Sequence, residues 1–204
     1  MIGIIDYGLG NVRAFSNIYH QLNVPHAVVR SPEDLVGVSR VILPGVGAFD
    51  QAMKRLQSSG MRDPLERLVR EKGCPVLGVC VGMQILMAAS EEGVAPGLGW
   101  IDGDVVQFRP QAEGERLATP HMGWNTVRPV TSATLFDGLD ADSRFYFLHS
   151  YFVRCRSTAD VLALTDYGGD FACAINHQNI YGVQFHPEKS HGYGIRLLKN
   201  FAEL

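Results

Sequence analysis

A cysteine with a glycine two residues to either side is the feature that most constrains what this chain can form. Cys80 stands between Gly78 and Gly82, after the apolar residues 75–79 and before residues 82–89, which are rich in helix formers. This order predicts a short buried strand followed by a helix, with Cys80 on the sharp turn between them and its sulfur exposed. Both glycines are expected to be required, because a side chain at either position would collide with neighbouring backbone. A helix that begins directly after the cysteine would also offer free N–H groups to a thiolate or an oxyanion.

A histidine and a glutamate far along the chain supply the groups that a cysteine nucleophile needs. His186-Pro187-Glu188 follows residues 179–183, which predict a strand whose Gly182 permits close packing. A thiol is mostly protonated near neutral pH, so a nucleophilic cysteine works with an imidazole that takes its proton. The glutamate is placed to orient that imidazole. A lone buried cysteine is more often structural, but the two motifs together predict a nucleophile, a base and an orienting carboxylate.

The order of apolar and polar segments predicts an α/β fold with a central, mostly parallel sheet flanked by helices. Strand-like and helical stretches alternate in the first half, and consecutive strands after about Asp102 predict a further antiparallel region. The loop 44–47 and Cys80 both follow strands, at the edge of the sheet where parallel strands gather binding sites. The chain is expected to form one domain, residues 1–204, with a polar turn at 111–115. The expected strands are 2–6, 27–30, 40–43, 75–79, 105–108, 126–129, 145–153, 162–165, 172–176 and 180–184, and the expected helices are 11–22, one from about Asp50, 82–89 and 193–202.

Charge and composition exclude several classes of function. The 204 residues carry a formal net charge of -3 without a basic block or an acidic tail, so neither nucleic-acid nor membrane binding is expected. There is no signal-peptide pattern and no apolar run long enough to cross a membrane, which predicts a cytoplasmic protein. The 4 cysteines form no CxxC pair, so Cys80 is expected to stay free in a reducing compartment. The others, Cys74, Cys155 and Cys173, are expected to be packing residues.

These motifs resemble those of the class I glutamine amidotransferases, which carry Gly-x-Cys-x-Gly-x-Gln and a later His-Pro-Glu. The resemblance covers nearly the whole chain and implies one amidotransferase domain, residues 1–204, that hydrolyses glutamine to glutamate and ammonia. Further blocks, at residues 7–11, 44–49, 120–125 and 146–151, are similar to those of one branch of the family. Members of that branch supply ammonia to a separate cyclase subunit, which makes imidazole glycerol phosphate and an aminoimidazole carboxamide ribotide in histidine biosynthesis. The resemblance implies neither a cofactor nor a metal.

Amide chemistry and the resemblance together indicate the site residues. The oxyanion formed during hydrolysis needs two N–H donors, and the expected donors are the backbone of Val81 and of the loop at Val46 and Gly47. In this family the peptide at Val46 is thought to reorient before its N–H takes part, which implies a nearly inactive isolated subunit. The implied catalytic residues are Cys80, His186 and Glu188, and the implied glutamine-holding residues are Gly47, Gln84, Glu92, Ser150 and Tyr151. The last four also fit packing or solvated positions.

The released ammonia needs an acceptor that these motifs do not supply. No second catalytic domain and no phosphate-binding fingerprint accompany them, so the acceptor enzyme is expected to be a separate polypeptide. The resemblance implies a heterodimer with a (β/α)8-barrel cyclase subunit. The expected interface residues are Asn11, Trp124, Tyr146 and Lys189. Trp124 also fits a core position, and Lys189 fits a charge contact to an acidic residue of the partner.

Other interpretations stay open. The same chemistry could serve a different acceptor, such as a surface-sugar amidotransferase system. A cysteine hydrolase of similar fold could act on another amide without transferring ammonia, although Gln84 and the loop 44–47 argue against it. A metal-binding scaffold could use His177, His186 and His191, but their spacing matches no His-Glu-x-x-His pattern.

Overall fold

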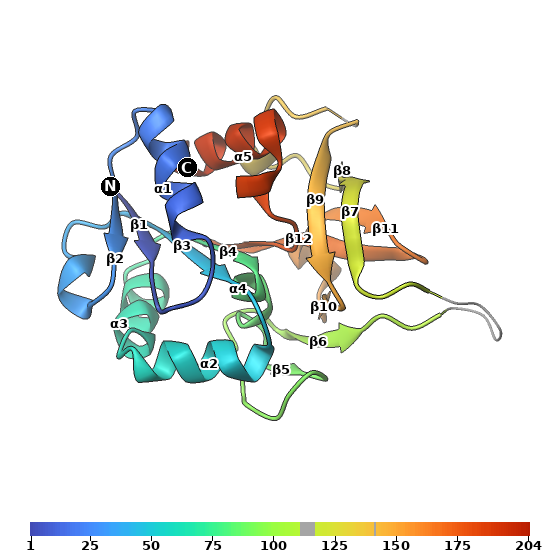
Figure 1. Cartoon of the computed structure of the whole chain (residues 1–204), viewed down its shortest axis with the longest axis horizontal. Helices are drawn as coiled ribbons and strands as arrows, with labels where there is room; N and C mark the ends of the chain where they lie inside the picture. Colours follow the sequence, from blue (N-terminus) through green and yellow to red (C-terminus); the bar gives the residue numbers. More distant parts are fainter. Residues whose placement is uncertain (111–116, 141) are drawn as a thin grey trace.

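A computed structural model describes residues 1–110, 117–140 and 142–204, and the polar turn expected at 111–115 lies outside these ranges. Within them the chain forms an 11-stranded mixed sheet, a separate 2-stranded sheet, and helices on both sides of the large sheet (Figure 1). The main path of the large sheet is β2 (His26–Val29), β1 (Ile2–Ile5), β3 (Arg40–Gly45), β4 (Val76–Cys80), β13 (Ile180–Val183), β12 (Asp170–His177), β10 (Tyr151–Cys155), β6 (Gly103–Gln107) and β5 (Ala89–Ser90), with β11 (Val161–Asp166) beside β12 and β8 (Arg128–Pro129) beside β11.

The strands from β2 to β13 run parallel, which confirms the predicted parallel sheet. β1, β3 and β4 are buried along nearly their whole length, because helices cover both faces of this part of the sheet. Figure 1 shows α1 (Val12–Gln21) and α5 (His191–Glu203) on one side, and α2 (Phe49–Ser58) and α3 (Arg62–Glu66) on the other. α3 continues as a π-helical segment at Arg67–Glu71.

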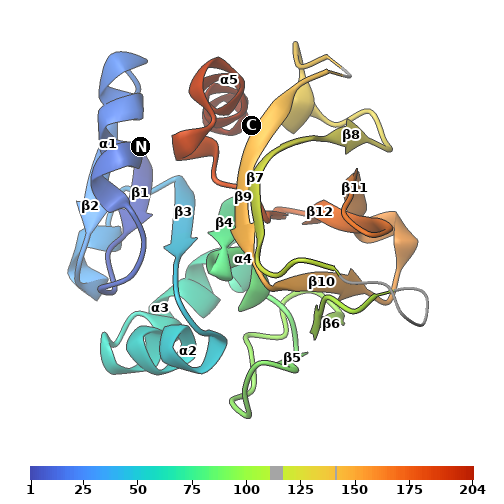
Figure 2. The same cartoon turned by 45° about the vertical axis from the view of Figure 1, so that its right-hand side comes forward.

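The second half of the chain adds antiparallel strands, which confirms the change of pattern after Asp102. β12 pairs antiparallel with β13, β10 and β11, and β10 pairs antiparallel with β6. β7 (His121–Thr126) and β9 (Arg144–His149) form the separate antiparallel pair. Figures 1 and 2 both show this pair running across the direction of β12. β9 thereby reaches the end of β4, where Leu148 O lies 3.9 Å from Cys80 Sγ.

The single strand expected over 145–153 is wrong, because the chain changes sheets at Ser150. The residues before Ser150 pair with β7, and those after it pair with β6. Ser150 belongs to neither strand, and its carbonyl accepts the backbone N–H of Phe108 at 3.2 Å. Neither glycine nor proline interrupts residues 144–155, so the sequence carries no turn signal at the break.

The helix expected over 82–89 is also wrong in length. It ends after one turn as α4 (Val81–Gln84). Ala88 N donates to Gly103 O, and Ala88 O accepts from Gly97 N, so backbone groups that a longer helix would use bond to distant segments instead. Contacts far apart in the sequence therefore set where this helix stops.

The strand expected over 126–129 starts earlier than predicted. β7 begins at His121, and the buried Val127 separates it from β8. Polar side chains hide this strand in the sequence, because the inward positions of β7 include His121 and Asn125 rather than a run of apolar residues.

Glycines allow the turn at Cys80 to press its backbone against β3. A Cβ on Gly82 would lie 1.9 Å from the carbonyl oxygen of Leu43, and a Cβ on Gly45 would lie 2.4 Å from Gly82 N. A Cβ on Gly78 would lie 2.5 Å from Gly82 O. The collisions expected from the sequence are therefore confirmed, and the close approach brings the end of β3 directly beside Cys80.

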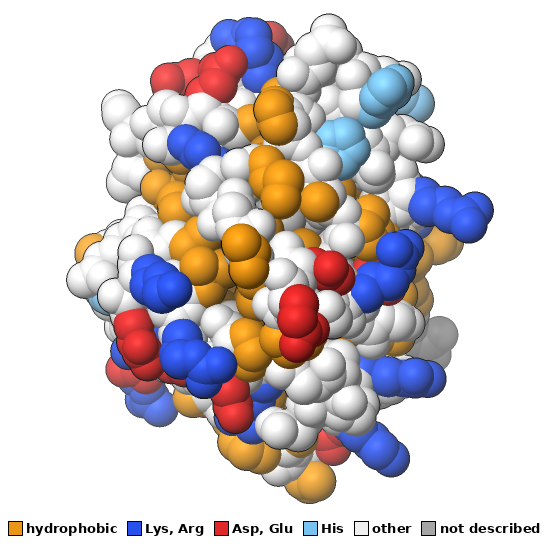
Figure 3. All heavy atoms as spheres, turned by 90° about the vertical axis from the view of Figure 1, so that its left-hand side faces the viewer, with side chains coloured by type: hydrophobic (Ala, Val, Ile, Leu, Met, Phe, Trp, Pro, Cys, Tyr) orange, Lys and Arg blue, Asp and Glu red, His pale blue; other side chains and the backbone are white. Residues whose placement is uncertain are grey.

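The face on the β2 side carries charges of both signs. Figure 3 shows Lys and Arg side chains interspersed with Asp and Glu, without a block of one sign. This face therefore lacks the continuous basic surface that binds nucleic-acid phosphates. No helix in the described ranges is both long and apolar enough to cross a membrane.

Replacing Gly82 by alanine is expected to destabilise the chain by at least ~2 kcal/mol, because the new methyl group meets backbone that cannot turn away. Gly192→Ala is the matched control. Nothing lies within 4 Å of the Cβ position of Gly192, so alanine there is expected to be neutral or to stabilise α5. Urea unfolding followed by circular dichroism measures both changes. Equal free energies of unfolding for the two variants would contradict the packing described for the turn.

Candidate active site

Cys80 lies where β4 passes into α4, and its backbone is strained. Its φ of 56° and ψ of -114° are values that residues other than glycine rarely adopt. The exposed sulfur expected from the sequence is wrong, because Cys80 is only 4% exposed and is reached through the pocket that it lines. Cys80 pairs in register with Gly45 of β3. Such a turn holds the sulfur in one direction, as a nucleophile requires.

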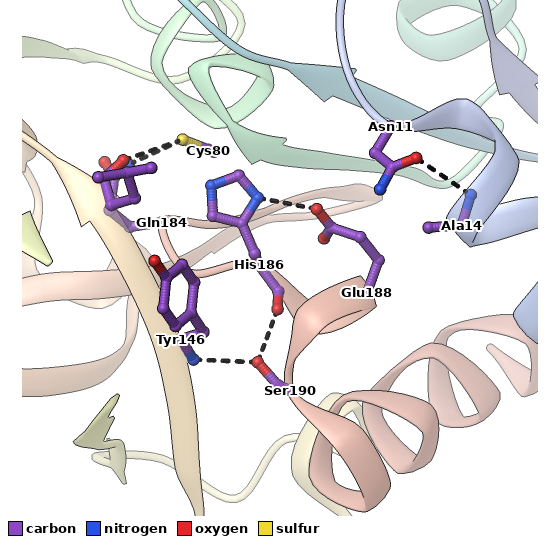
Figure 4. A network of polar contacts seen from close by, with 9 residues as sticks. Asn11, Ala14, Cys80, Tyr146, Gln184, His186, Glu188 and Ser190 are labelled. Carbon is purple, nitrogen blue, oxygen red and sulfur yellow. Dashed lines mark hydrogen bonds and ion pairs between the residues drawn. The ribbon is translucent and has the colours of Figure 1, made fainter. Parts of the chain in front are cut away.

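His186 and Glu188 lie beside Cys80 (Figure 4). His186 Nδ1 lies 2.9 Å from Glu188 Oε1, and both side chains are almost completely buried. Because a carboxylate oxygen only accepts, Nδ1 carries a proton and Nε2 is left for the sulfur. Cys80 lies on the other side of the imidazole from Glu188 (Figure 4), close enough to affect the pKa of His186. The three side chains therefore follow one another in the order sulfur, imidazole, carboxylate.

The backbone of His186 is held in place by β9. His186 N donates to Tyr146 O at 2.8 Å, and Ser190 Oγ donates to His186 O at 2.6 Å. Ser190 Oγ also accepts the backbone N–H of Tyr146 at 3.0 Å (Figure 4). These bonds tie the segment after β13 to β9, so the imidazole keeps its position relative to Cys80.

Opposing effects act on the pKa of His186. Burial lowers this pKa, but the hydrogen bonds and charges of Cys80 and Glu188 outweigh burial and raise it above its usual range. The protonated imidazole is therefore favoured between the sulfur and the carboxylate. A group with this preference can take a proton from a thiol and hold it for a later step.

A pocket of about 300 Å³ opens at Cys80. Its size suits a small molecule. The set of lining residues contains every expected catalytic, oxyanion and glutamine-holding residue except Glu188, which lies behind His186. The pocket is lined by Val46, Gly47, Cys80, Val81, Gln84, Glu92, Pro120, Leu148, His149, Ser150, Tyr151, His186 and Lys189.

The loop that follows β3 is anchored at both ends. Tyr7 Oη donates to Pro44 O at 2.8 Å, and burial raises the pKa of Tyr7 above its usual range, so the hydroxyl keeps this proton. At the other end, the backbone N–H of Phe49 donates to Glu92 Oε2 at 2.8 Å. Asp50 accepts two further backbone N–H bonds from the segment after Glu92. The start of α2 is therefore clamped to the segment that carries Glu92.

The middle of the same loop is open. Val46 is 41% exposed, and Gly47 has a φ of 89°, which favours glycine. Gly45 pairs with Cys80 across β3 and β4, so the loop starts next to the sulfur. A peptide group at Val46 therefore has space to rotate, and the neighbouring Gly47 can adopt the backbone angles that a rotation requires.

Gln84 and Tyr151 meet in the wall of the pocket. Gln84 Nε2 donates to Tyr151 O at 3.0 Å and to Gln184 Oε1 at 3.1 Å. Both amide hydrogens are engaged, so Gln84 can offer only its carbonyl oxygen to a ligand. Ser150, between β9 and β10, also lines the pocket. The structure thus brings the expected glutamine-holding side chains together around the sulfur.

Three residues expected at a partner interface, Trp124, Tyr146 and Lys189, lie together, and Lys189 also lines the pocket. The ring of Trp124 is 6.1 Å from that of Tyr146, edge to face, and Lys189 Nζ lies 5.5 Å from the centre of the Tyr146 ring. Trp124 is 39% exposed, which excludes the core position that its sequence context left open. Asn11 is exposed as well, but its Oδ1 caps α1 by accepting Ala14 N at 3.4 Å (Figure 4).

A buried pair of histidines next to the pocket was not predicted. His149 Nδ1 donates to Tyr151 O at 2.8 Å, and His149 Nε2 lies 3.0 Å from His121 Nδ1. A carbonyl only accepts, so His149 Nε2 must accept from His121 Nδ1, which leaves His121 Nε2 to accept from Asn125 Nδ2 at 3.3 Å. Burial lowers the pKa of His121 to about 4 and that of His149 to about 3, so both rings stay neutral. The two residues are register partners across β7 and β9, a signal that is readable only once β7 is recognised.

The histidines of the metal-binding interpretation have separate partners. His177 Nδ1 lies 3.0 Å from Asp160 Oδ1, and the ring of His191 stacks on that of Trp124 at 5.2 Å between centroids. His186 is engaged by Glu188, as described above. In the described ranges no group of three or more His, Cys, Asp or Glu side chains is arranged to hold a metal ion.

The remaining cysteines are protonated thiols in packed surroundings. Burial raises the pKa of Cys155 to about 12 and raises the pKa values of Cys74 and Cys173 above their usual range. All the cysteines, Cys80 included, are free rather than disulfide-bonded.

The neutral histidine pair predicts a loss of stability in mild acid. In the unfolded chain both histidines bind a proton near the ordinary histidine pKa of 6.5. In the folded chain His121 binds a proton only near pH 4 and His149 only near pH 3. The free energy of unfolding should therefore fall as pH drops through this window, by up to ~1.4 kcal/mol per pH unit for each histidine. Urea unfolding at a series of pH values measures the slope.

In that series His121→Gln should flatten the slope, because glutamine does not titrate, whereas His20→Gln, at an exposed position of α1, should leave the slope unchanged. A wild-type slope in His121→Gln would contradict the assigned protonation states.

Comparisons with known proteins agree with this geometry. The family model described as glutamine amidotransferase class-I matches residues 3–204. The crystal structure of a glutamine amidotransferase superposes with a TM-score of 0.72 at 21% identity, covering 100% of this chain and 99% of that one. The glutaminase domain of Trypanosoma brucei CTPS superposes with a TM-score of 0.68 at 16% identity, covering 99% of this chain and 93% of that one. At these identities the solved structures support the fold alone.

Curated relatives are similar over their full length. The imidazole glycerol phosphate synthase subunit HisH of Bdellovibrio bacteriovorus is 56% identical over 204 residues, 100% of both chains. The subunit of the same name from Leptospira borgpetersenii is 51% identical, again over 100% of both chains, and HisH 2 of Methanococcus maripaludis is 43% identical over 98% of both. This chain therefore belongs to the class I glutamine amidotransferases, in the branch formed by the HisH subunits of imidazole glycerol phosphate synthase.

Proposed function

We propose that this chain is the glutaminase subunit of an imidazole glycerol phosphate synthase: it hydrolyses glutamine and supplies the ammonia to a separate cyclase subunit in histidine biosynthesis. The observation that carries the proposal is the buried pair of His186 and Glu188 beside the strained Cys80, at a pocket of about 300 Å³. The proposal treats residues 1–204 as one catalytic domain of a cytoplasmic enzyme without cofactor or metal.

Acylation starts at the sulfur. His186 Nε2 takes the proton of the Cys80 thiol, and the sulfur attacks the δ-carbonyl carbon of glutamine. The resulting imidazolium is stabilised by Glu188, whose oxygen accepts the Nδ1 proton at 2.9 Å. The imidazolium then protonates the departing amide nitrogen, so ammonia leaves and a γ-glutamyl thioester remains on Cys80.

Deacylation uses the same groups in reverse. The neutral imidazole of His186 takes a proton from water, which attacks the thioester carbonyl, and the carbon–sulfur bond breaks to release glutamate. Each half of the reaction forms an oxyanion. Val81 N, at the start of α4, lies next to the sulfur and is the donor that the turn supplies without rearrangement.

The second oxyanion donor is assigned to the loop at Val46 and Gly47. Support comes from the register, because Gly45 is opposite Cys80, and from the exposure of Val46. Fixed ends with an open middle suit a loop that adopts its active form only in a complete complex. This arrangement gives a physical reason for low activity of the isolated chain.

The substrate amino acid is assigned to the residues around the pocket. Glu92 can meet the α-ammonium group with the carboxylate oxygen that does not hold Phe49 N, and Gln84 can accept through its free carbonyl oxygen. Ser150 and Tyr151 offer donors from the junction of β9 and β10. These groups come from separate segments of the chain and surround the pocket, which favours one orientation of a small ligand.

The partner is assigned to the surface formed by Trp124, Tyr146 and Lys189, together with Asn11 at the N-terminal cap of α1. Curated relatives named as subunits of a synthase support the need for a second chain. Tryptophan and tyrosine are enriched among the residues that anchor protein interfaces. Tyr146 also bonds to the backbone of His186, so a partner at this surface would contact the element that holds the base.

Glutamate release tests the proposal directly. The chain alone should be nearly inactive, and addition of the cyclase subunit with its ligand should raise glutamate release by a large factor, because the loop is completed only in the complex. Cys80→Ser should fold normally, judged by circular dichroism, and lose this activity. Ammonium salt should restore the cyclase product in the presence of that variant.

Retained glutaminase activity in Cys80→Ser would overturn the mechanism. Glutamate release that never responds to the cyclase would point to another acceptor or to a hydrolase that does not transfer ammonia.

Lys189→Ala should weaken coupling to the cyclase more than folding. Lys189 is exposed and its ammonium group lies over the Tyr146 ring, so its removal is expected to cost under ~1 kcal/mol of stability. We expect a several-fold higher concentration of cyclase to be needed for half-maximal activation, measured by titration of glutaminase activity. Lys54→Ala, on the exposed side of α2, is the matched control and should behave as the wild type. Unchanged activation in Lys189→Ala would remove this residue from the interface.

A further inference from the structure

Gln184 is a buried polar residue that no expected role uses. It follows β13 and comes two residues before His186, and none of its surface is exposed. Its backbone N–H donates to Cys173 O at 2.8 Å, which fixes the backbone against β12. Its side-chain Nε2 lies 3.8 Å from Cys80 Sγ (Figure 4). A buried amide costs stability unless its N–H and C=O groups are hydrogen-bonded, so its hydrogen-bond partners indicate its role.

The orientation of this amide is decided by a backbone carbonyl. Tyr151 O can only accept, so the atom of Gln84 that lies 3.0 Å from it must be the amide nitrogen. The same nitrogen lies 3.1 Å from Gln184, and because a nitrogen donor needs an acceptor there, the Gln184 atom must be its oxygen. The other end of the Gln184 amide, which faces Cys80, is therefore the NH2 group. A flipped amide would set two donors against each other.

The sulfur of Cys80 thus has two kinds of neighbour. Leu148 O, 3.9 Å away, can accept a hydrogen bond from a thiol but repels a thiolate. Gln184 Nε2, 3.8 Å away, can donate to a thiolate and gains little from a thiol. Each neighbour favours a different protonation state of the sulfur.

We infer that Gln184 is a positioning residue of the glutaminase site that presents a side-chain N–H to Cys80 Sγ and stabilises the thiolate. Gln84 holds the amide in this orientation, and Tyr151 O fixes Gln84. The inference rests on the proposed nucleophilic role of Cys80. The sulfur would then have two stabilising neighbours, the imidazolium of His186 and the neutral N–H donor of Gln184.

The donor acts at both ends of the reaction. Before attack, the sulfur carries the electron pair left when its proton moves to His186, and the N–H of Gln184 stabilises that charge. In the thioester the sulfur is neutral, and the contact is weak. When the carbon–sulfur bond breaks in deacylation, the bonding pair returns to the sulfur and the same N–H stabilises the leaving thiolate. Loss of the donor should therefore lower kcat, while the KM for glutamine changes little.

The test removes the donor and measures the sulfur itself. Gln184→Met keeps the approximate length of the side chain but has no N–H, and Gln184→Asn keeps an amide that is too short to reach the sulfur. Iodoacetamide labels Cys80 in the isolated chain at fixed pH, and peptide mapping separates this label from those on the other cysteines. Both variants should be labelled about tenfold more slowly than the wild type, the loss expected for a hydrogen bond to a charged group. The ultraviolet absorbance of the thiolate, measured against Cys80→Ser as the blank, should fall in parallel.

Asn200→Leu is the matched control. Asn200 is another buried amide, which donates to Leu135 O and Asp137 O far from the pocket, so its loss should lower the melting temperature without changing the labelling of Cys80. Equal labelling and thiolate absorbance in wild type and both Gln184 variants would overturn the inference, even if their kcat falls. A labelling difference in a chain that releases no glutamate with any cyclase would refute the proposed function and leave the contact between Gln184 and Cys80 standing.

Discussion

The close approach of two backbones, Gly82 against Leu43, decides where every group of the site can be. It presses the turn after β4 onto β3, which leaves Cys80 opposite Gly45 in the sheet register. The loop after β3 then begins beside the sulfur, and β13, the parallel neighbour of β4 on the other side, leads to His186. Adjacent parallel strands end at the same edge of a sheet, so this loop, Cys80 and His186 meet there although they are far apart in the sequence. The strained backbone of Cys80 is tolerated because the packing of this turn against β3 holds the backbone in that conformation.

The site combines a rigid part with one open segment. His186 is held through its side chain by Glu188 and through its backbone by Tyr146 and Ser190. Gln184, Gln84 and Tyr151 form a second set of directional bonds that ends at the sulfur. By contrast, residues 46–48 are exposed between their anchored ends. The proposed acid–base groups are therefore held rigidly, as proton transfer requires, while the open segment is where the proposed partner would alter activity.

Features of the fold and site that depend on neighbouring residues were predictable from the sequence, whereas features that depend on contacts far apart in the chain were not. The elbow at Cys80, the His-Pro-Glu motif and the alternation of strands and helices depend on neighbouring residues, so they were predictable. The change of sheets at Ser150 and the early end of α4 depend on partners far along the chain, such as Phe108 and Gly103, and no local pattern reports them. Gln184 stood inside a recognised block, but its role depends on the orientation of an amide that is set by Tyr151, and only three-dimensional contacts reveal it.

The distribution of the cysteines has a consequence for how the protein fails under oxidative stress. Burial keeps Cys74, Cys155 and Cys173 as poorly reactive thiols, while Cys80 lines an open pocket. Thiols that stay protonated react slowly with oxidants, so a small oxidant that enters the pocket is expected to attack Cys80, the proposed nucleophile, before the cysteines that serve packing. Activity should disappear while the fold persists, and early sulfenic acid damage would be reversible by a thiol reductant. In a cell, inactive protein of this kind would be a reserve that reduction can return to use.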